Sequence, residues 1–212
     1  METTLAQTET QTDRKSVLHV GCGSPRDNSL NAYFRDKERW QEIRLDINPN
    51  AKPDIVSDIR DMSPVDSESM DAVWSSHNIE HLHSWEVPGA LKEFYRVLKP
   101  GGFLLITLPS IEVVAKHIVE NGLETPMYHS PAGPITPVDT IFGHQASLMR
   151  GEHFMAHKTA FTPKTLAQKL QVAGFDMIQV TESGFDLWAL AFRDHTQRTE
   201  SIQLRSGNTP TA

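Results

Sequence analysis

The chain has 212 residues, of which 38% are hydrophobic and 22% are charged, and its formal net charge is −7 at pH 7. This length suits one domain with a sizeable core. The acidic balance argues against a surface that coats nucleic acid or an anionic membrane. The single cysteine, Cys22, excludes an intrachain disulfide and a zinc site built from cysteines.

No apolar run approaches the roughly 18 residues of a membrane span. The N-terminus also lacks the basic start and apolar core of a secretory signal, and we therefore expect a cytoplasmic protein. Residues 1–13 hold almost nothing to bury. We expect them to form a disordered arm that precedes a domain at 14–193.

The first predicted element of that domain is a short buried strand at 16–20, which runs into Gly21, Cys22 and Gly23. Glycines lack a Cβ atom, so they permit positive φ and let a ligand lie directly against the main chain. In open α/β folds, nucleotide-like ligands bind at this carboxyl edge of the sheet. Taken alone, two glycines also fit a plain tight turn.

A short crossover leads to a second predicted strand at 42–47, which carries Asp46 near its end. A carboxylate about twenty residues past a glycine turn can accept both hydroxyls of a ribose, although it also fits a turn or a helix cap. A third strand at 53–57 precedes Asp58, which can accept a hydrogen bond from an exocyclic amine. Ile59 next to it offers an apolar surface for a purine ring.

The following predicted elements are a strand at 70–75, a helix at 88–98, a strand at 103–110 and a helix at 111–121. This alternation predicts a parallel sheet with helices on both faces.

Near the C-terminus, Thr162 precedes Pro163 as an N-cap and opens a helix at 164–174. Two further strands, at 175–183 and 186–193, are separated by a glycine turn and are expected to form an antiparallel hairpin. Residues 194–212 are expected to be a polar tail.

Residues 123–158 interrupt this pattern with four prolines and no sustained periodicity. Long irregular segments in compact domains are usually functional, and we interpret this one as a lid over the ligand-bearing edge. Its methionine and aromatic side chains suit a pocket for a ring-bearing metabolite, and a role in the core or in an interface is equally consistent with them.

Five segments stand in order along the chain: VLHVGCG, LDINP, SDIRDM, DAVWSSHNIEHL and RVLKPGGFLLITLP. In this combination the chain from 17 to 193 resembles the class I S-adenosylmethionine-dependent methyltransferases, in particular their small-molecule branch. The resemblance implies an α/β fold with a Rossmann-like, doubly wound, mostly parallel seven-stranded sheet whose last strand is antiparallel. It also implies S-adenosyl-L-methionine as the cofactor and S-adenosyl-L-homocysteine as the product.

The resemblance further implies which residues hold this cofactor. The methionine and ribose parts would contact the glycine turn, Asp46 would hold the ribose, Ile47, Asp58 and Ile59 would surround the adenine, and two serines would line the methionyl end. These expected cofactor residues are Gly21, Cys22, Gly23, Asp46, Ile47, Asp58, Ile59, Ser75 and Ser76. Two positions depart from the family pattern: His19 stands where Asp or Glu is frequent, and Ser24 follows the turn where a third glycine is usual.

Methyl transfer requires an aligned acceptor, and a hydroxyl acceptor usually also needs a base near its proton. Three histidines lie around the inferred cofactor edge, and our hypothesis is that one of His81, His144 and His157 is that general base. Another pattern, His153 and His157 with His144, has the spacing of metal ligands on a helix. It lacks a glutamate between the paired histidines, and we expect no metal there.

The favoured function is methyl transfer to the hydroxyl of a ring-bearing small molecule. The alternatives are N-methyl transfer to a small molecule, a non-catalytic cofactor-binding protein of the same fold, and a nicotinamide-dependent oxidoreductase. That last class normally shows a third glycine, where this chain has Arg26. We expect a small-molecule partner and no nucleic acid or membrane; the oligomeric state is left open, with a homodimer as one option.

Overall fold

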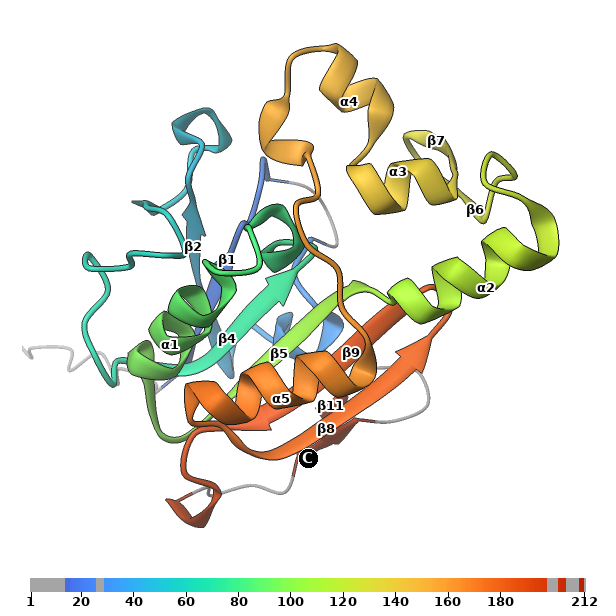
Figure 1. The fold of residues 1–212 in the computed structure, drawn as a ribbon. Coiled ribbons are helices and arrows are strands. Elements are labelled where there is room, and N and C mark those ends of the chain that lie inside the picture. Colours follow the sequence, from blue (N-terminus) through green and yellow to red (C-terminus); the bar gives the residue numbers. More distant parts are fainter. Residues whose placement is uncertain (1–13, 26–28, 198–201, 205–209, 212) are drawn as a thin grey trace, which may run out of the picture.

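The computed structural model describes residues 14–25, 29–197, 202–204 and 210–211, so the arm expected at 1–13 lies outside it. The main sheet is built from β1 (Lys15–Val20), β2 (Trp40–Asp46), β3 (Ile55–Val56), β4 (Met70–Ser76), β5 (Leu98–Pro109), β8 (Asp176–Ser183) and β9 (Asp186–Phe192). Its strand order is β3-β2-β1-β4-β5-β9-β8 (Figure 1).

The direction of the strands matches the expected sheet. Strands β1 to β5 pair in parallel, whereas β9 lies antiparallel to both of its neighbours, β5 and β8. The prediction of a mostly parallel seven-stranded sheet with an antiparallel last strand is therefore confirmed. The strand order changes direction at β1, because the chain continues to β2 and β3 on one side of it and to β4 and β5 on the other. The carboxyl ends of the strands at such a topological switch point are where α/β sheets bind ligands.

One face of the sheet carries two of the longer helices, α1 (Val87–Val97) and α5 (Pro163–Ala173), which lie on the same side in Figure 1. Their inward side chains, Leu91, Phe94 and Leu166 among them, are fully buried in the larger core cluster. Helix α5 begins as the sequence predicts, because the Thr162 side chain accepts a hydrogen bond from the Thr165 amide.

The opposite face is covered differently from the expectation. Its cluster is aromatic, with Phe34, Trp40 and Phe103 packed at ring-centroid distances of 4.9 to 6.2 Å. Within the described residues no α-helix contributes to this cluster; only η1 (Ala32–Phe34), a single 3-10 turn, does. The expectation of helices on both faces is met on this face, in the described residues, only by that 3-10 turn in the crossover between β1 and β2.

The predicted polar tail also takes part in this second face. Ile202 is only 5% exposed and belongs to the aromatic cluster. Beside it, β10 (Gln203–Leu204) pairs antiparallel with β11 (Pro210–Thr211). Part of the segment 194–212 therefore packs on the domain, and η5 (His195–Gln197) begins it.

The segment at 123–158 is more regular than expected. After α2 (Ile111–Asn121) it contains β6 (Tyr128–Ser130), β7 (Gly133–Ile135), α3 (Pro137–Phe142), α4 (Gln145–Met149) and η4 (His153–Met155). Figure 1 shows α3 and α4 beyond the carboxyl ends of β4 and β5. In the part of the chain that the structure describes, no helix is long and apolar enough to span a bilayer.

Candidate functional site

The glycine turn after β1 adopts the conformation that the sequence predicts. Gly21 and Gly23 have φ of 58° and 59°, a region that side chains disfavour. A Cβ atom on Gly21 would lie 2.0 Å from Asn78 Nδ2, whereas a Cβ on Gly23 would have no atom within 4 Å. The first glycine is thus needed for packing, and the second opens the main chain toward free space.

Asp46, at the end of β2, lies directly beside this turn. Its Oδ2 accepts a hydrogen bond from the Gly23 amide at 2.8 Å, and its Oδ1 accepts one from the Asn48 amide at 2.8 Å. The residue is 9% exposed. Each carboxylate oxygen can accept more than one hydrogen bond, so Asp46 retains acceptor capacity while it fixes the turn.

Two residues that sequence reasoning missed brace the same turn. Arg44 Nη2 donates to Gly23 O at 2.5 Å, and its Nη1 donates to Lys52 O at 2.9 Å. Asn78 Nδ2 donates to Val20 O at 2.7 Å. Arg44 reaches the turn from within β2, and Asn78 reaches it from the segment that follows β4.

His19, which departs from the family pattern, lies inside β1 and is 2% exposed. Its Nδ1 is 2.6 Å from Glu42 Oε1 on β2. The imidazole therefore pairs within the sheet.

Of the expected adenine residues, Asp58 is held by a neighbouring arginine. Arg60 binds both of its carboxylate oxygens, with the Nη2 to Oδ2 distance at 2.6 Å. Burial opposes ionisation, but the Arg60 bonds outweigh it and hold the pKa of Asp58 below its ordinary value. Ile59 is 9% exposed and packs in the larger core cluster, whereas Ile47 is 45% exposed. Ile47 is thus the more accessible apolar surface at this edge.

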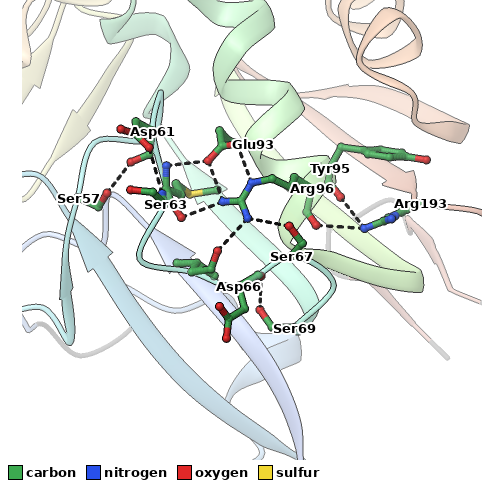
Figure 2. A network of polar contacts seen from close by, with 12 residues as sticks. Ser57, Asp61, Ser63, Asp66, Ser67, Ser69, Glu93, Tyr95, Arg96 and Arg193 are labelled. Atoms are coloured by element: carbon green, nitrogen blue, oxygen red, sulfur yellow. Dashed lines mark hydrogen bonds and ion pairs between the residues drawn. The ribbon is translucent and has the colours of Figure 1, made fainter.

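The loop that carries Asp58 and Ile59 is anchored to α1 through Arg96, whose guanidinium reaches into the loop in Figure 2. Arg96 Nε donates to Glu93 Oε1 at 2.7 Å, and its Nη2 donates to Met62 O at 2.8 Å. Glu93 Oε2 accepts the Met62 amide at 2.7 Å. This partly buried ion pair and its hydrogen bonds to the main chain tie the loop to the helix.

The expected methionyl-end residues come from β4 and from the turn. Ser75 is fully buried, pairs with Val20 of β1 in the sheet register, and its Oγ has no hydrogen-bond partner. Ser76 is half-buried beside it. Burial raises the pKa of the Cys22 thiol to about 11, which keeps it protonated at neutral pH and does not suit a thiolate nucleophile.

Two of the three histidines proposed as bases stand together. His81 ends η3 (Ile79–His81), which follows β4, and its ring lies 4.8 Å from the ring of His157. His81 Nδ1 is 3.1 Å from Ala156 O, and His157 Nδ1 is 2.6 Å from Thr140 O. A ring N–H donated to each carbonyl leaves both Nε2 atoms as acceptors.

The carboxylate of Glu80 lies among these rings, and sequence reasoning missed it. Glu80 is 1% exposed, and its Oε1 is 3.3 Å from Nδ1 of His77, whose Nε2 is 3.7 Å from Asp186 Oδ2. Burial opposes the charge on both partners. The carboxylates of Asp186 and Glu80 nevertheless raise the pKa of His77 to about 10, and His77 lowers the pKa of Glu80.

His144 and His153 do not join this cluster. His144 is the N-cap of α4, with Nδ1 2.9 Å from Ser147 Oγ. His153 is exposed in η4, a 3-10 turn, so His153 and His157 do not share a helix face. The arrangement that the spacing of His144, His153 and His157 suggested is therefore not formed.

The site as a whole places the glycine turn, Asp46, Ser75 and the histidine pair at the carboxyl ends of β1, β2 and β4. His157 brings the segment at 123–158 into this edge, because the amides of Lys158 and Thr159 donate to Glu80 O. Burial lowers the pKa of His157, which Glu80 only partly offsets, so its ring is neutral at pH 7. Such an edge can hold a nucleoside-like ligand and promote proton loss from a second molecule.

Comparison with known proteins agrees with this geometry. Residues 18–106 match the model of a family described as a methyltransferase domain. Among curated proteins, none matches the chain.

Three solved structures illustrate the fold. One is an S-adenosylmethionine-dependent methyltransferase from Archaeoglobus fulgidus, with 17% identity, a TM-score of 0.55, and coverage of 85% of this chain and 87% of that one. Another, from Methanosarcina mazei, has 19% identity, a TM-score of 0.52, and coverage of 84% and 91%. A third, from Mesorhizobium loti, has 15% identity, a TM-score of 0.54, and coverage of 86% and 92%.

Proposed function

We propose that this S-adenosylmethionine-dependent methyltransferase of the class I fold transfers the methyl group to a hydroxyl of a ring-bearing small molecule. The family match at residues 18–106 supports methyl transfer, and the strand order supports the fold. The acceptor is our inference. It rests on one observation above all, the pairing of His81 with the neutral His157 at the carboxyl end of β4.

The residues at the edge fit this cofactor. Gly23 exposes main chain to open space, Asp46 offers carboxylate oxygens beside it, and Ser75 Oγ is a buried polar atom without a partner. We propose that these three residues, with exposed Ile47 against the adenine, hold it. Cofactor-binding roles for Cys22, Ser76, Asp58 and Ile59 are part of the same proposal. Bound S-adenosylmethionine supplies an electrophilic methyl group on a positively charged sulfur.

The histidine pair favours oxygen over nitrogen as the acceptor atom. A hydroxyl loses a proton as it is methylated and gains from an adjacent group that promotes this loss, whereas a neutral amine needs little help. His81 and His157 hold their Nδ1 atoms against main-chain carbonyls, which leaves both Nε2 atoms able to act. N-methyl transfer is the second candidate, and it would make these two histidines dispensable.

The segment at 123–158 supports an apolar, ring-bearing acceptor. Tyr128 stacks on Phe185 with the ring centroids 5.7 Å apart, and Phe142 and Phe154 are 57% and 67% exposed. Exposed aromatic side chains near a site favour a ligand with an apolar face. Together with the net charge of −7, they favour a small-molecule partner over nucleic acid or an anionic membrane.

The proposal is tested in two stages. Isothermal titration with S-adenosylmethionine and S-adenosylhomocysteine should give micromolar binding, and NADH should give none. Methyl transfer is then screened by mass spectrometry against phenols, catechols and matched aromatic amines. His81→Gln and His157→Gln should reduce turnover of the hydroxyl acceptor and alter its pH profile.

Transfer to amines alone would refute the hydroxyl assignment. Turnover by both variants that is unchanged across pH would refute it as well. Cofactor binding with no product from any acceptor would favour a non-catalytic protein.

A further inference from the structure

The carboxylate of Glu80 is buried, and its oxygens lack hydrogen-bond partners among the described residues. The residue is 1% exposed. His77 contributes one ion-pair contact to Oε1 at 3.3 Å. A buried charge normally persists only where it is paired and hydrogen-bonded, or where it coordinates a metal.

Two imidazoles complete a set of three converging ligands. One ligand atom from each of Glu80, His81 and His157 lies within 4.8 Å of the other two. The Nδ1 atoms of both histidines are at hydrogen-bond distance from main-chain carbonyls, at 3.1 Å and 2.6 Å. Metal-binding histidines are typically oriented in this way, with one ring N–H donated to a carbonyl and the other nitrogen left unprotonated for the metal.

The ligands come from two parts of the chain that the fold brings together. Glu80 and His81 are adjacent in η3, and His157 follows η4. The Lys158 and Thr159 amides donate to Glu80 O at 2.8 Å and 3.2 Å and hold the second segment against the first. His77 precedes Glu80 by three residues and forms ion pairs with both Glu80 and Asp186 of β9. It can therefore orient the Glu80 carboxylate without being a metal ligand.

We propose that Glu80, His81 and His157 bind one divalent first-row transition ion, of the class of Mn²⁺, Fe²⁺, Co²⁺ or Zn²⁺. Two imidazoles and one carboxylate suit this class, and three protein ligands leave positions open for a further oxygen. With metal–ligand bonds of about 2 Å, the ligand atoms of a tetrahedral site stand about 3.3 Å apart. Binding therefore draws the three groups closer than the present 4.8 Å limit.

This inference rests on the proposed O-methyl transfer and specifies how the histidine pair acts. The acceptor hydroxyl binds at an open position of the ion, which lowers the pKa of that hydroxyl by Lewis-acid polarisation. Its O–H bond breaks and the proton leaves to solvent. The oxygen then forms the new bond to the methyl carbon as the carbon–sulfur bond breaks. No electron is gained or lost, so no oxidant or reductant is required.

The test uses cobalt as the probe. The full chain is treated with EDTA, exchanged into metal-free buffer, and titrated with Co²⁺ by calorimetry and visible absorption. We expect one site per chain, with an absorption band characteristic of nitrogen and oxygen ligands. Glu80→Gln and His157→Gln should each weaken Co²⁺ binding at least tenfold. His153→Gln is the matched control, because this exposed histidine belongs to the other spacing pattern and should leave the affinity unchanged.

Folding of each variant is checked by circular dichroism in EDTA, and His81→Gln replaces any variant that does not fold. Absence of a Co²⁺ site in the folded chain, or equal affinity in the ligand variants and in wild type, would overturn the inference. Titration with S-adenosylmethionine in EDTA separates this result from the proposed function. Cofactor binding without a Co²⁺ site removes only the metal, whereas a Co²⁺ site without cofactor binding would remove the proposed methyl transfer.

Discussion

Gly21 and Gly23 share nearly the same backbone conformation but differ in what surrounds them. We predict that Gly21→Ala destabilises the fold strongly, because the added Cβ would collide with the Asn78 side chain in addition to the strain at positive φ. Gly23→Ala should cost only about 1–2 kcal/mol, the price of the left-handed conformation, since its Cβ meets open space. Urea unfolding measures both values.

Gly23→Ala should affect cofactor affinity more than stability, because we propose that the cofactor occupies the open space beside Gly23. Gly23→Ala should remain folded and lose most S-adenosylmethionine binding in calorimetry. A folded Gly23→Ala variant that binds like wild type would show that this part of the turn does not face the ligand.

Asp46 holds the turn and, in our proposal, the ribose. Asp46→Asn keeps the side-chain shape but replaces one acceptor oxygen with an NH2 group that faces the Gly23 or Asn48 amide. We expect S-adenosylmethionine affinity to fall roughly 10–100-fold, the range for loss of a hydrogen bond to a charged group. Asp54→Asn is the control, since its carboxylate also accepts a main-chain amide, that of Arg44, but lies outside the proposed contacts. Equal losses in the two variants would refute a specific role for Asp46.

At the scale of elements, the segment at 123–158 is held by a capping box at the start of α3. Asp139 Oδ2 accepts the Thr136 amide at 2.9 Å, and Oδ1 accepts the Gln145 amide at 2.9 Å. Burial acts against these bonds, but they prevail and lower the pKa of Asp139 from its ordinary 3.8. A lowered pKa stabilises the segment above pH 3.8, and this contribution is lost as the pH falls through the folded value.

We therefore predict that the amide NMR signal of Gln145 titrates with a midpoint below 3.8. Asp139→Ala should speed hydrogen exchange at Thr136 and Gln145 at neutral pH, because both amides lose their acceptor. Amides inside α5 serve as the internal reference and should not change. A midpoint at or above 3.8 would contradict the role assigned to this carboxylate.

The elements that the sequence predicted best are those with local signals. Strand β1, helix α2 and the start of α5 follow from β-branched residues, a 3.6-residue period and the Thr162 cap, which neighbours in the chain determine. The positive φ at the glycine turn was also predictable. The support from Arg44 and Asn78 was not predictable, because each reaches that turn from a neighbouring strand or the segment after it, and contacts across the sheet leave no local pattern.

Glu80 illustrates the same limit in the site. The sequence SSHNIEHLH drew attention to its histidines, whereas the burial of Glu80 depends on main-chain contacts with residues nearly eighty positions later. His157 was predicted near the cofactor edge, and the structure pairs it with His81. Sequence spacing suggested His144 and His153 as its partners, but η4 is a 3-10 turn, so His153 and His157 do not lie on one helix face.

For the whole molecule, the two faces of the sheet are covered by different structural elements. Helices α1 and α5 cover one face, and aromatic rings with Ile202 cover the other. We predict that Ile202→Ala lowers the free energy of unfolding by about 2–5 kcal/mol, the cost of a large-to-small change in a core. Chemical denaturation measures it. Gln203→Ala is the control, because Gln203 is exposed beside it. A loss within experimental error for Ile202→Ala would mean that the C-terminal segment does not pack on the domain.

The aromatic face also determines which structural changes alter the intrinsic tryptophan fluorescence of this protein. Of its four tryptophans, Trp40 and Trp74 are 3% exposed in that cluster and Trp188 packs against it, while Trp85 is 74% exposed. Trp74 precedes Ser75 in β4, yet its ring stacks on Trp188 on the face opposite to α1 and α5. Intrinsic fluorescence should therefore follow the melting of one face of the sheet and respond weakly to ligands at its edge. An optical binding assay needs a reporter placed elsewhere.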